Sequence, residues 1–278
     1  MSGKKNDAKT NPLGMRQLEN GGPFVLPPMA CSAHRRDYFQ RANRILATYM
    51  TLTAYADAGK KSIDNAAATL KWSSPTGIRV GMGSHTFQTT YRLLQGAFAK
   101  AGGQLNNQVF LLIYGNFEAF LIDLISDALK SDGETDPIQG AVAMLASTKW
   151  EGRFNRISQK LSIGLGKQAF IVKYSGIEMG IMGKATNNPI EFLQAMADFR
   201  HRLVHSAGRA DAKLLEQYPN IGVSEGDLIQ MPFGFPMDIH LFFVPMTDLF
   251  DEVFAARFGW KRDITAPEHL IDKDLRII

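Results

Sequence analysis

The sequence contains a single cysteine, Cys31, among its 278 residues. One cysteine cannot form a disulfide within the chain or supply the repeated thiolates of a cysteine-based metal site. Long apolar stretches are also missing, since the longest runs, 109–114 and 241–246, are far shorter than the roughly 20 residues that cross a bilayer. The first residues are rich in lysine and asparagine and lack the apolar core of a signal peptide. We therefore expect a soluble cytoplasmic protein with no membrane contact.

The formal net charge is only +4, but the cations are unevenly distributed. Residues 1–33 combine glycine, proline and asparagine with several lysines, which predicts a flexible basic leader. A basic arm of this kind can bind phosphate groups, and a solubilising tail is the alternative interpretation. The cations of residues 1–44 are Lys4, Lys5, Lys9, Arg16, Arg35, Arg36, Arg41 and Arg44.

Apolar spacing predicts helices over most of the chain, and therefore an all-α fold. The expected helices span 34–58, 62–71, 86–102, 105–130, 137–147, 150–165, 188–206 and 238–258. A glycine-rich connection is expected at 77–85, and 221–231 is the only segment with a strand-like pattern. These elements suggest four regions: the leader at 1–33, a helical N-terminal extension at 34–104, a helical bundle at 105–260 and a C-terminal tail at 261–278.

Two segments are similar to cofactor or metal motifs but lack residues that those motifs require. Gly164 to Lys167 has too short a spacing for a phosphate-binding loop, and Gln168 stands where that motif needs Ser or Thr. His201 and His205 have the spacing of two zinc ligands on one helix, but Arg202 replaces the glutamate of the metalloprotease motif. We therefore expect neither a metal nor a cofactor.

The helix expected at about 189–206 has well-defined ends. Asn188 is a suitable N-cap, Pro189 suits the first helical position, and Glu191 completes a capping box. Gly208 is a natural C-terminal stop.

Arg200 falls in the middle of the apolar face of this helix, with His201 and His205 together at the edge. A guanidinium does not lose its proton, so its burial requires an acidic partner or a functional cavity. A structural ion pair is one explanation, and a site that binds phosphate and transfers protons is the other. The apolar face consists of Phe192, Leu193, Met196, Ala197, Phe199, Leu203 and Val204.

The sequence RHRLVH at 200–205 resembles the R-φ-x-x-x-H signature of the HEPN superfamily, in which φ is a polar residue. Two other Arg–His pairs have similar spacing but lie in segments without a helical pattern: Arg79 with His85, and Arg262 with His269. Only the 200–205 motif ends a well-capped amphipathic helix. The resemblance implies a HEPN-like helical bundle.

A second helix strengthens this resemblance, which covers about 105–258. In the HEPN bundle a long apolar helix with an embedded acidic residue packs against the motif helix, and residues 109–129 resemble that helix. Its apolar stripe consists of Phe110, Ile113, Tyr114, Phe117, Leu121, Leu124 and Ala128. Leu111 and Ile125 lie beside this stripe and widen the apolar face, and Glu118 lies within the widened face. We therefore expect Glu118 to pair with Arg200. A solvated position for Glu118 is the alternative.

The resemblance implies a metal-independent endoribonuclease. His205 would remove the proton of a ribose 2′-hydroxyl, and Arg200 would bind the scissile phosphate. His201 would protonate the leaving oxygen or orient the phosphate, while Arg202 and Arg209 would contact the RNA backbone. The resemblance also implies a homodimer with facing motifs, a toxin or phage-defence role, and an antitoxin or regulatory protein as a further partner. The alternatives are a non-catalytic HEPN-like module that binds RNA or protein, and a helical scaffold in which the motif is a coincidence.

Overall fold

The computed structural model describes residues 30–73, 76–82, 85–146, 149–175, 179–181, 184–219, 221–262 and 264–265, and these are mostly helical. The predicted all-α class is therefore confirmed. The helices are α1 (Ala33–Thr69), α2 (Tyr91–Ser131), α3 (Pro137–Leu145), α4 (Trp150–Leu161), α5 (Lys167–Lys173), α6 (Pro189–His205), α7 (Ala212–Gln217) and α8 (Phe235–Phe258).

Short antiparallel strand pairs accompany the helices. β1 (Ala30–Cys31) pairs with β6 (Ile264–Thr265), β2 (Gly77–Met82) with β3 (His85–Thr90), and β4 (Met179–Ile181) with β5 (Lys184–Thr186). The strand pair expected at 221–231 is wrong, because this segment forms turns and contributes only an isolated bridge between Leu228 and Arg209. Within the glycine-rich segment expected at 77–85, residues 77–82 form β2, which pairs with β3.

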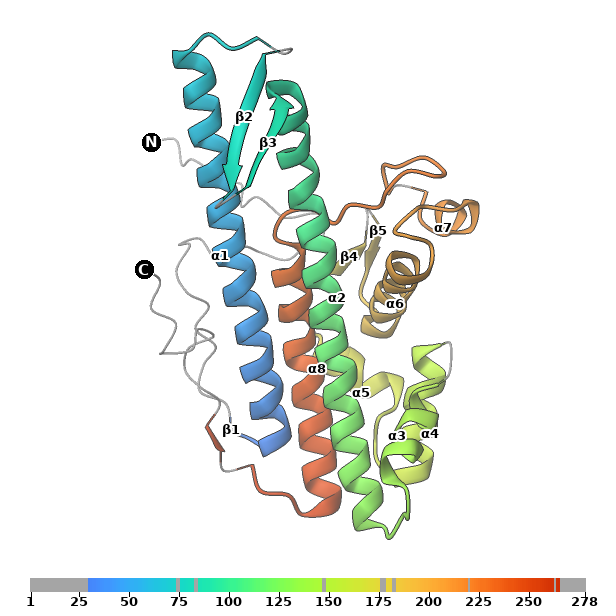
Figure 1. The fold of residues 1–278 in the computed structure, drawn as a ribbon. Coiled ribbons are helices and arrows are strands. Elements are labelled where there is room, and N and C mark those ends of the chain that lie inside the picture. Colours follow the sequence, from blue (N-terminus) through green and yellow to red (C-terminus); the bar gives the residue numbers. More distant parts are fainter. Residues whose placement is uncertain are drawn as a thin grey trace, which may run out of the picture.

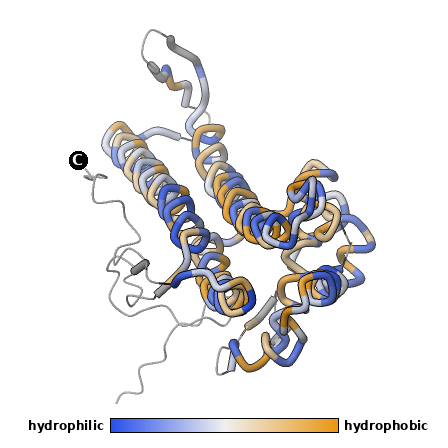
Figure 2. Tube along the Cα trace, turned by 90° about the horizontal axis from the view of Figure 1, so that it is seen from below, coloured by the Kyte–Doolittle hydropathy of each residue, from blue (hydrophilic) through white to orange (hydrophobic). Residues whose placement is uncertain are grey.

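Three long helices, α1, α2 and α8, run side by side, and α3 to α7 cover one side of them (Figure 1). Seen from below in Figure 2, the shorter helices lie on one side of the long ones, and the helices carry both hydrophobic and hydrophilic residues. The helices pack together in this way because each one buries its apolar side against the others.

Aromatic side chains fill the centre of this bundle. Phe117 of α2 stacks on Phe243 of α8 with ring centroids 4.2 Å apart. Trp150 of α4 is fully buried beside them, and its Nε1 donates a hydrogen bond to the Tyr114 hydroxyl at 2.9 Å. The apolar stripe expected on the long helix is buried throughout. This packing fixes α4 against the part of α2 that carries Glu118.

The expected boundary between residues 104 and 105 lies inside α2, so one continuous helix crosses it. The first half of α1 is part of the common core, because Tyr38, Phe39 and Leu46 are buried there. The helices expected at 34–58 and 62–71 are one helix, and the second helix likewise continues through 102–105. Only the distal ends of α1 and α2, with the β2–β3 pair, extend away from the shorter helices (Figure 1).

The prediction of a phosphate-binding arm up to residue 44 is partly wrong. Arg35 is fully buried, and its NH1 lies 2.5 Å from Asp248 Oδ1. Arg41 is held by Asp123 at 3.3 Å. Arg35 therefore joins α1 to α8 inside the core, and Arg41 joins α1 to α2 at the surface. Four further cations of the expected arm lie outside the described residues: Lys4, Lys5, Lys9 and Arg16.

The described ends of the chain are also attached to the bundle. Residues 30–33, expected within the leader, form β1 and the start of α1, and Ser32 donates through its backbone N to Asp251 Oδ2 at 3.1 Å. Arg262, expected in the tail, binds the same carboxylate through Nε at 2.9 Å. Asp251 is completely buried, so it needs both donors.

The second helix, α2, is long and apolar enough to cross a membrane by length and composition alone, with a mean hydropathy of 1.7 in its most apolar window. In this structure 61% of that window is buried inside the protein. A core helix of a soluble protein meets the same criterion, so this helix is only weak support for a membrane location.

Candidate functional site

The motif helix α6 begins and ends much as the sequence predicts. Asn188 Oδ1 accepts a hydrogen bond from the Ile190 backbone N at 3.1 Å, and Glu191 accepts one from the Asn188 side-chain amide at 2.9 Å. The helix ends at His205, and the chain then turns through Ala207 and Gly208, both with positive φ. Glycine adopts this left-handed conformation without steric cost, which explains why the stop lies here.

Arg200 pairs with Glu118, as expected. Arg200 NH2 lies 3.3 Å from Glu118 Oε2 and joins α6 to α2. The burial expected for Arg200 is wrong, because 39% of its side chain is exposed. The preceding Phe199 and the earlier Met196 are fully buried, whereas Leu203, beyond the arginine, is only partly buried against the core. The guanidinium is therefore accessible to a ligand while a carboxylate holds it in place.

A second arginine, Arg153 of α4, shares the same carboxylate. Its NH1 lies 3.6 Å from Glu118 Oε1, and its guanidinium lies 4.3 Å from the centroid of the Trp150 ring. The cation–π contact and the ion pair together restrict its position. Sequence reasoning missed Arg153, because its spacing on an ordinary amphipathic helix gives no sign that it approaches α2.

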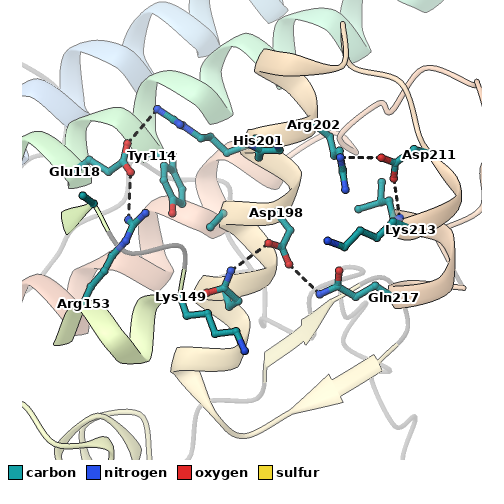
Figure 3. A pocket seen from close by; sticks show the side chains of 15 residues that line it. Tyr114, Glu118, Lys149, Arg153, Asp198, His201, Arg202, Asp211, Lys213 and Gln217 are labelled. Atoms are coloured by element: carbon teal, nitrogen blue, oxygen red, sulfur yellow. Dashed lines mark hydrogen bonds and ion pairs between the residues drawn. The ribbon is translucent and has the colours of Figure 1, made fainter. Parts of the chain in front are cut away.

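These side chains border an open pocket of about 680 Å³, formed by α2, α4, α6 and α7 (Figure 3). We call it the cationic pocket, because five Lys or Arg side chains line it against three carboxylates. The cations are Lys149, Arg153, Arg200, Arg202 and Lys213, and the carboxylates are Glu118, Asp198 and Asp211. Lys149 and Lys213 are exposed, and neither forms an ion pair within the described residues. The pocket therefore presents excess positive charge to an anion.

The three carboxylates are already bound by residues around the pocket, as Figure 3 shows. Arg202 NH1 lies 2.8 Å from Asp211 Oδ2. Asp198 accepts hydrogen bonds from Gln194 at 3.1 Å, Gln217 at 2.9 Å and the Tyr218 hydroxyl at 3.2 Å. Burial, reinforced by the negative charge of Asp198, raises the pKa of Tyr218, and the phenol donates to that carboxylate.

The two histidines of the motif lie side by side, with ring centroids 4.6 Å apart. Both are exposed, but only His201 lines the cationic pocket with Arg200. His205 lies next to it, outside the lining. Arg209, expected to contact RNA, lies outside the pocket as well, and its NH1 donates to the Gly226 carbonyl at 2.6 Å. Its observed role is to tie the turn after α6 to the following loop.

The arrangement can bind an anion and place an imidazole beside it. Guanidinium groups suit phosphate because their fixed donors match two oxygens at once. Imidazole exchanges protons near neutral pH more readily than the other side chains. Across the described ranges, no three His, Cys, Asp or Glu side chains come together as metal ligands would. No family model, curated protein or solved structure matches this chain.

Proposed function

We propose that this protein is a metal-independent endoribonuclease with a HEPN-like bundle. The observation that carries the proposal is the Glu118–Arg200 ion pair, which places the arginine of the motif at the cationic pocket beside two adjacent histidines. Arg200 is half-exposed beside further cations, and this arrangement supports phosphate binding followed by proton transfer.

In the proposed reaction Arg200 binds the scissile phosphate and stabilises the charge that develops on its oxygens. His205 removes the proton from the adjacent 2′-hydroxyl, and the 2′-oxygen attacks phosphorus. The bond between phosphorus and the 5′-oxygen breaks, and His201 in its protonated form supplies the proton to the leaving oxygen. The products are a 2′,3′-cyclic phosphate and a 5′-hydroxyl. Glu118 acts by holding Arg200 in position.

Further features of the proposal come from the resemblance. Two copies would associate with their motifs facing each other, and the exposed side of α6, with His201, Val204 and His205, is available for such a contact. Facing motifs would also bring the His205 of each copy close to the partner's site. The cell would use the protein in the cytoplasm as a toxin or phage-defence effector, controlled by an antitoxin or another regulatory protein.

The second candidate is a non-catalytic HEPN-like module that binds RNA or protein. The position of His205 outside the lining of the cationic pocket favours this alternative. A binding module needs the cations of the pocket but no imidazole near the phosphate.

Cleavage of single-stranded RNA in EDTA separates the two candidates. We expect the wild-type protein to cut the RNA, and Arg200→Ala and His205→Ala each to abolish cutting. An RNA with 2′-deoxyribose at the cut site should resist, because the nucleophile is missing. His201→Ala should lower the rate as much as His205→Ala if it is the general acid, and less if it only orients the phosphate.

The matched control is Arg257→Ala, since Arg257 is an exposed arginine near the end of α8 whose guanidinium lies over Phe258. Circular dichroism and light scattering must show that each variant keeps its helices and its oligomeric state. Equal cleavage by wild-type and well-folded His205→Ala protein would show that the histidine assignment is wrong. Binding of RNA without any cleavage would favour the binding module.

A further inference from the structure

A second pocket, of about 590 Å³, lies between α2, the turn after α6 and residues 228–230. None of its lining side chains is charged, in contrast to the cationic pocket. An uncharged pocket gives no electrostatic stabilisation to a phosphate. Its ligand is therefore expected to be a neutral group.

Three glutamines, Gln104, Gln108 and Gln230, line this pocket, which we call the amide pocket. All three are exposed, and their amides have no hydrogen-bond partner among the residues that the structure describes. In contrast, the side-chain amide of Asn107, which also lines the pocket, already forms two hydrogen bonds. It donates to the Ile229 carbonyl at 2.7 Å and accepts from the Met231 backbone N at 2.9 Å. Asn107 therefore holds residues 229–231 against α2, and the glutamine side chains remain available to a ligand. The apolar part of the lining includes Leu105, Leu111, Leu203 and Leu228.

Gly103 of α2 lets one of these amides approach the helix. A Cβ at this position would lie 2.8 Å from Gln230 Oε1 and 2.9 Å from its Cδ, so an alanine would displace the Gln230 side chain. The neighbouring Gly102 has open space around the same position. The two adjacent glycines thus offer a substitution that disturbs the amide pocket and a matched one that does not.

The two pockets follow each other along α2. Leu111 lines the amide pocket and Tyr114, one helical turn further, lines the cationic pocket. From Leu111 to Glu118 the helix rises about 10 Å. Both pockets also border α6, through Leu203 and Arg202. A single strand whose phosphate lies at Arg200 therefore has its neighbouring nucleotides within reach of the amide pocket.

We propose that the amide pocket binds a nucleobase of the RNA strand held at the cationic pocket, an inference that rests on the proposed function. A carboxamide has both donors and an acceptor, as the edge of a base does, and apolar walls pack against the faces of the base. Glutamine matches adenine best, since it can accept from N6 and donate to N7 together. The pocket thus gives the enzyme a preference for adenine next to the cut.

The first test measures binding of 2′-O-methyl octamers of A, C or U by fluorescence anisotropy, because 2′-O-methyl ribose cannot be cut by 2′-hydroxyl attack. We expect wild-type protein to prefer the A octamer. The double variant Gln104→Leu with Gln108→Leu and the single variant Gly103→Ala should each reduce this preference at least about fivefold. Gly102→Ala should keep it. An unchanged preference in the double variant and Gly103→Ala, or none in the wild type, overturns the proposal.

The second test uses adenosine, which has no phosphate, in ligand-observed NMR. We expect wild-type and Arg200→Ala proteins to bind it, and the double glutamine variant and Gly103→Ala to lose binding. Adenosine binding that survives in both amide-pocket variants, or is absent from the wild type, overturns the proposal. The RNA-cleavage assay is scored separately: cleavage without adenosine binding rejects only the base site, and adenosine binding without cleavage rejects only the endoribonuclease.

Discussion

His240 of α8 is expected to make the stability of this protein depend on pH between about 6.5 and 4. Its side chain is fully buried between α1 and α8, with ring centroids 6.1 Å from those of both Tyr38 and Phe39. Within the described residues neither of its nitrogens has a hydrogen-bond partner. Burial alone lowers the pKa of His240 from 6.5 to about 4, because a charged imidazole would lose its hydration.

The sign of the effect follows from which state binds the proton first. In the unfolded chain the imidazole protonates near pH 6.5, and in the folded protein only near pH 4. As the pH falls from 6.5 to 4, protonation therefore favours the unfolded state. A fall in pKa of this size corresponds to about 3 kcal/mol in the free energy of unfolding, present above pH 6.5 and lost by pH 4.

The perturbation is His240→Leu, measured by urea unfolding followed by circular dichroism at pH 7, 6, 5 and 4. The free energy of unfolding of the wild-type protein should fall by about 3 kcal/mol relative to that of the variant as the pH falls from 7 to 4. The difference between the two proteins removes the contribution of carboxylates, which both share. His34→Leu is the matched control, because His34 is partly exposed beside Asp127. A stability difference between wild type and His240→Leu that stays constant with pH would refute the reasoning.

Three further predictions follow from ion pairs and glycines. Asp248→Ala leaves the fully buried Arg35 guanidinium without its carboxylate, so unfolding in urea should show a loss of about 3–5 kcal/mol, and adding Arg35→Met should recover part of it. Glu118→Gln removes a negative charge from the cationic pocket, so we expect a DNA oligonucleotide to bind more tightly in an anisotropy assay. The same variant should cleave RNA more slowly because Arg200 loses its positioning carboxylate, and faster cleavage would contradict this role of Glu118. Gly102→Ala should raise the free energy of unfolding by about 0.5–1 kcal/mol, since it places alanine in an open helical position, whereas Gly103→Ala should gain less because it meets Gln230.

The motif helix and its acidic partner were predictable because their signals are local. Caps, the stop at Gly208 and the apolar period define α6, and the same period on α2 places Glu118 beside the buried stripe. The ion pair between Glu118 and Arg200 then followed from the cost of a lone charge on an apolar face. The exposure of Arg200 did not follow, because periodicity does not show where the contact between two helices ends.

Helix boundaries failed where glycines interrupt a helical pattern. The expected break after residue 58 is absent, because α1 continues through Gly59, and a Cβ there would be only 3.6 Å from the Phe98 ring of α2. A glycine costs a helix only about 1 kcal/mol, so a single glycine does not end a helix of 37 residues. Apolar spacing alone did not show that the two expected helices are continuous.

Contacts between distant parts of the chain could not be predicted from the sequence. The pairs Arg35–Asp248 and Arg153–Glu118 depend on how helices are placed, and no local pattern reports that placement. The sequence therefore gives no sign that Arg35, one of the cations of residues 1–44, is a core residue. The β4–β5 pair was missed for a related reason, since its three-residue strands are too short to show an alternating pattern.

The pairing of β1 with β6 has a consequence for how the protein is made. Ala30 lies opposite Thr265, and the buried Asp251 accepts hydrogen bonds from Ser32 and from Arg262. A ribosome releases the first helix long before it synthesises the segment that completes its surroundings. The buried polar groups at the start of α1 obtain their partners only after Asp251 and Arg262 have been synthesised. This end of the bundle therefore cannot close until both segments are present.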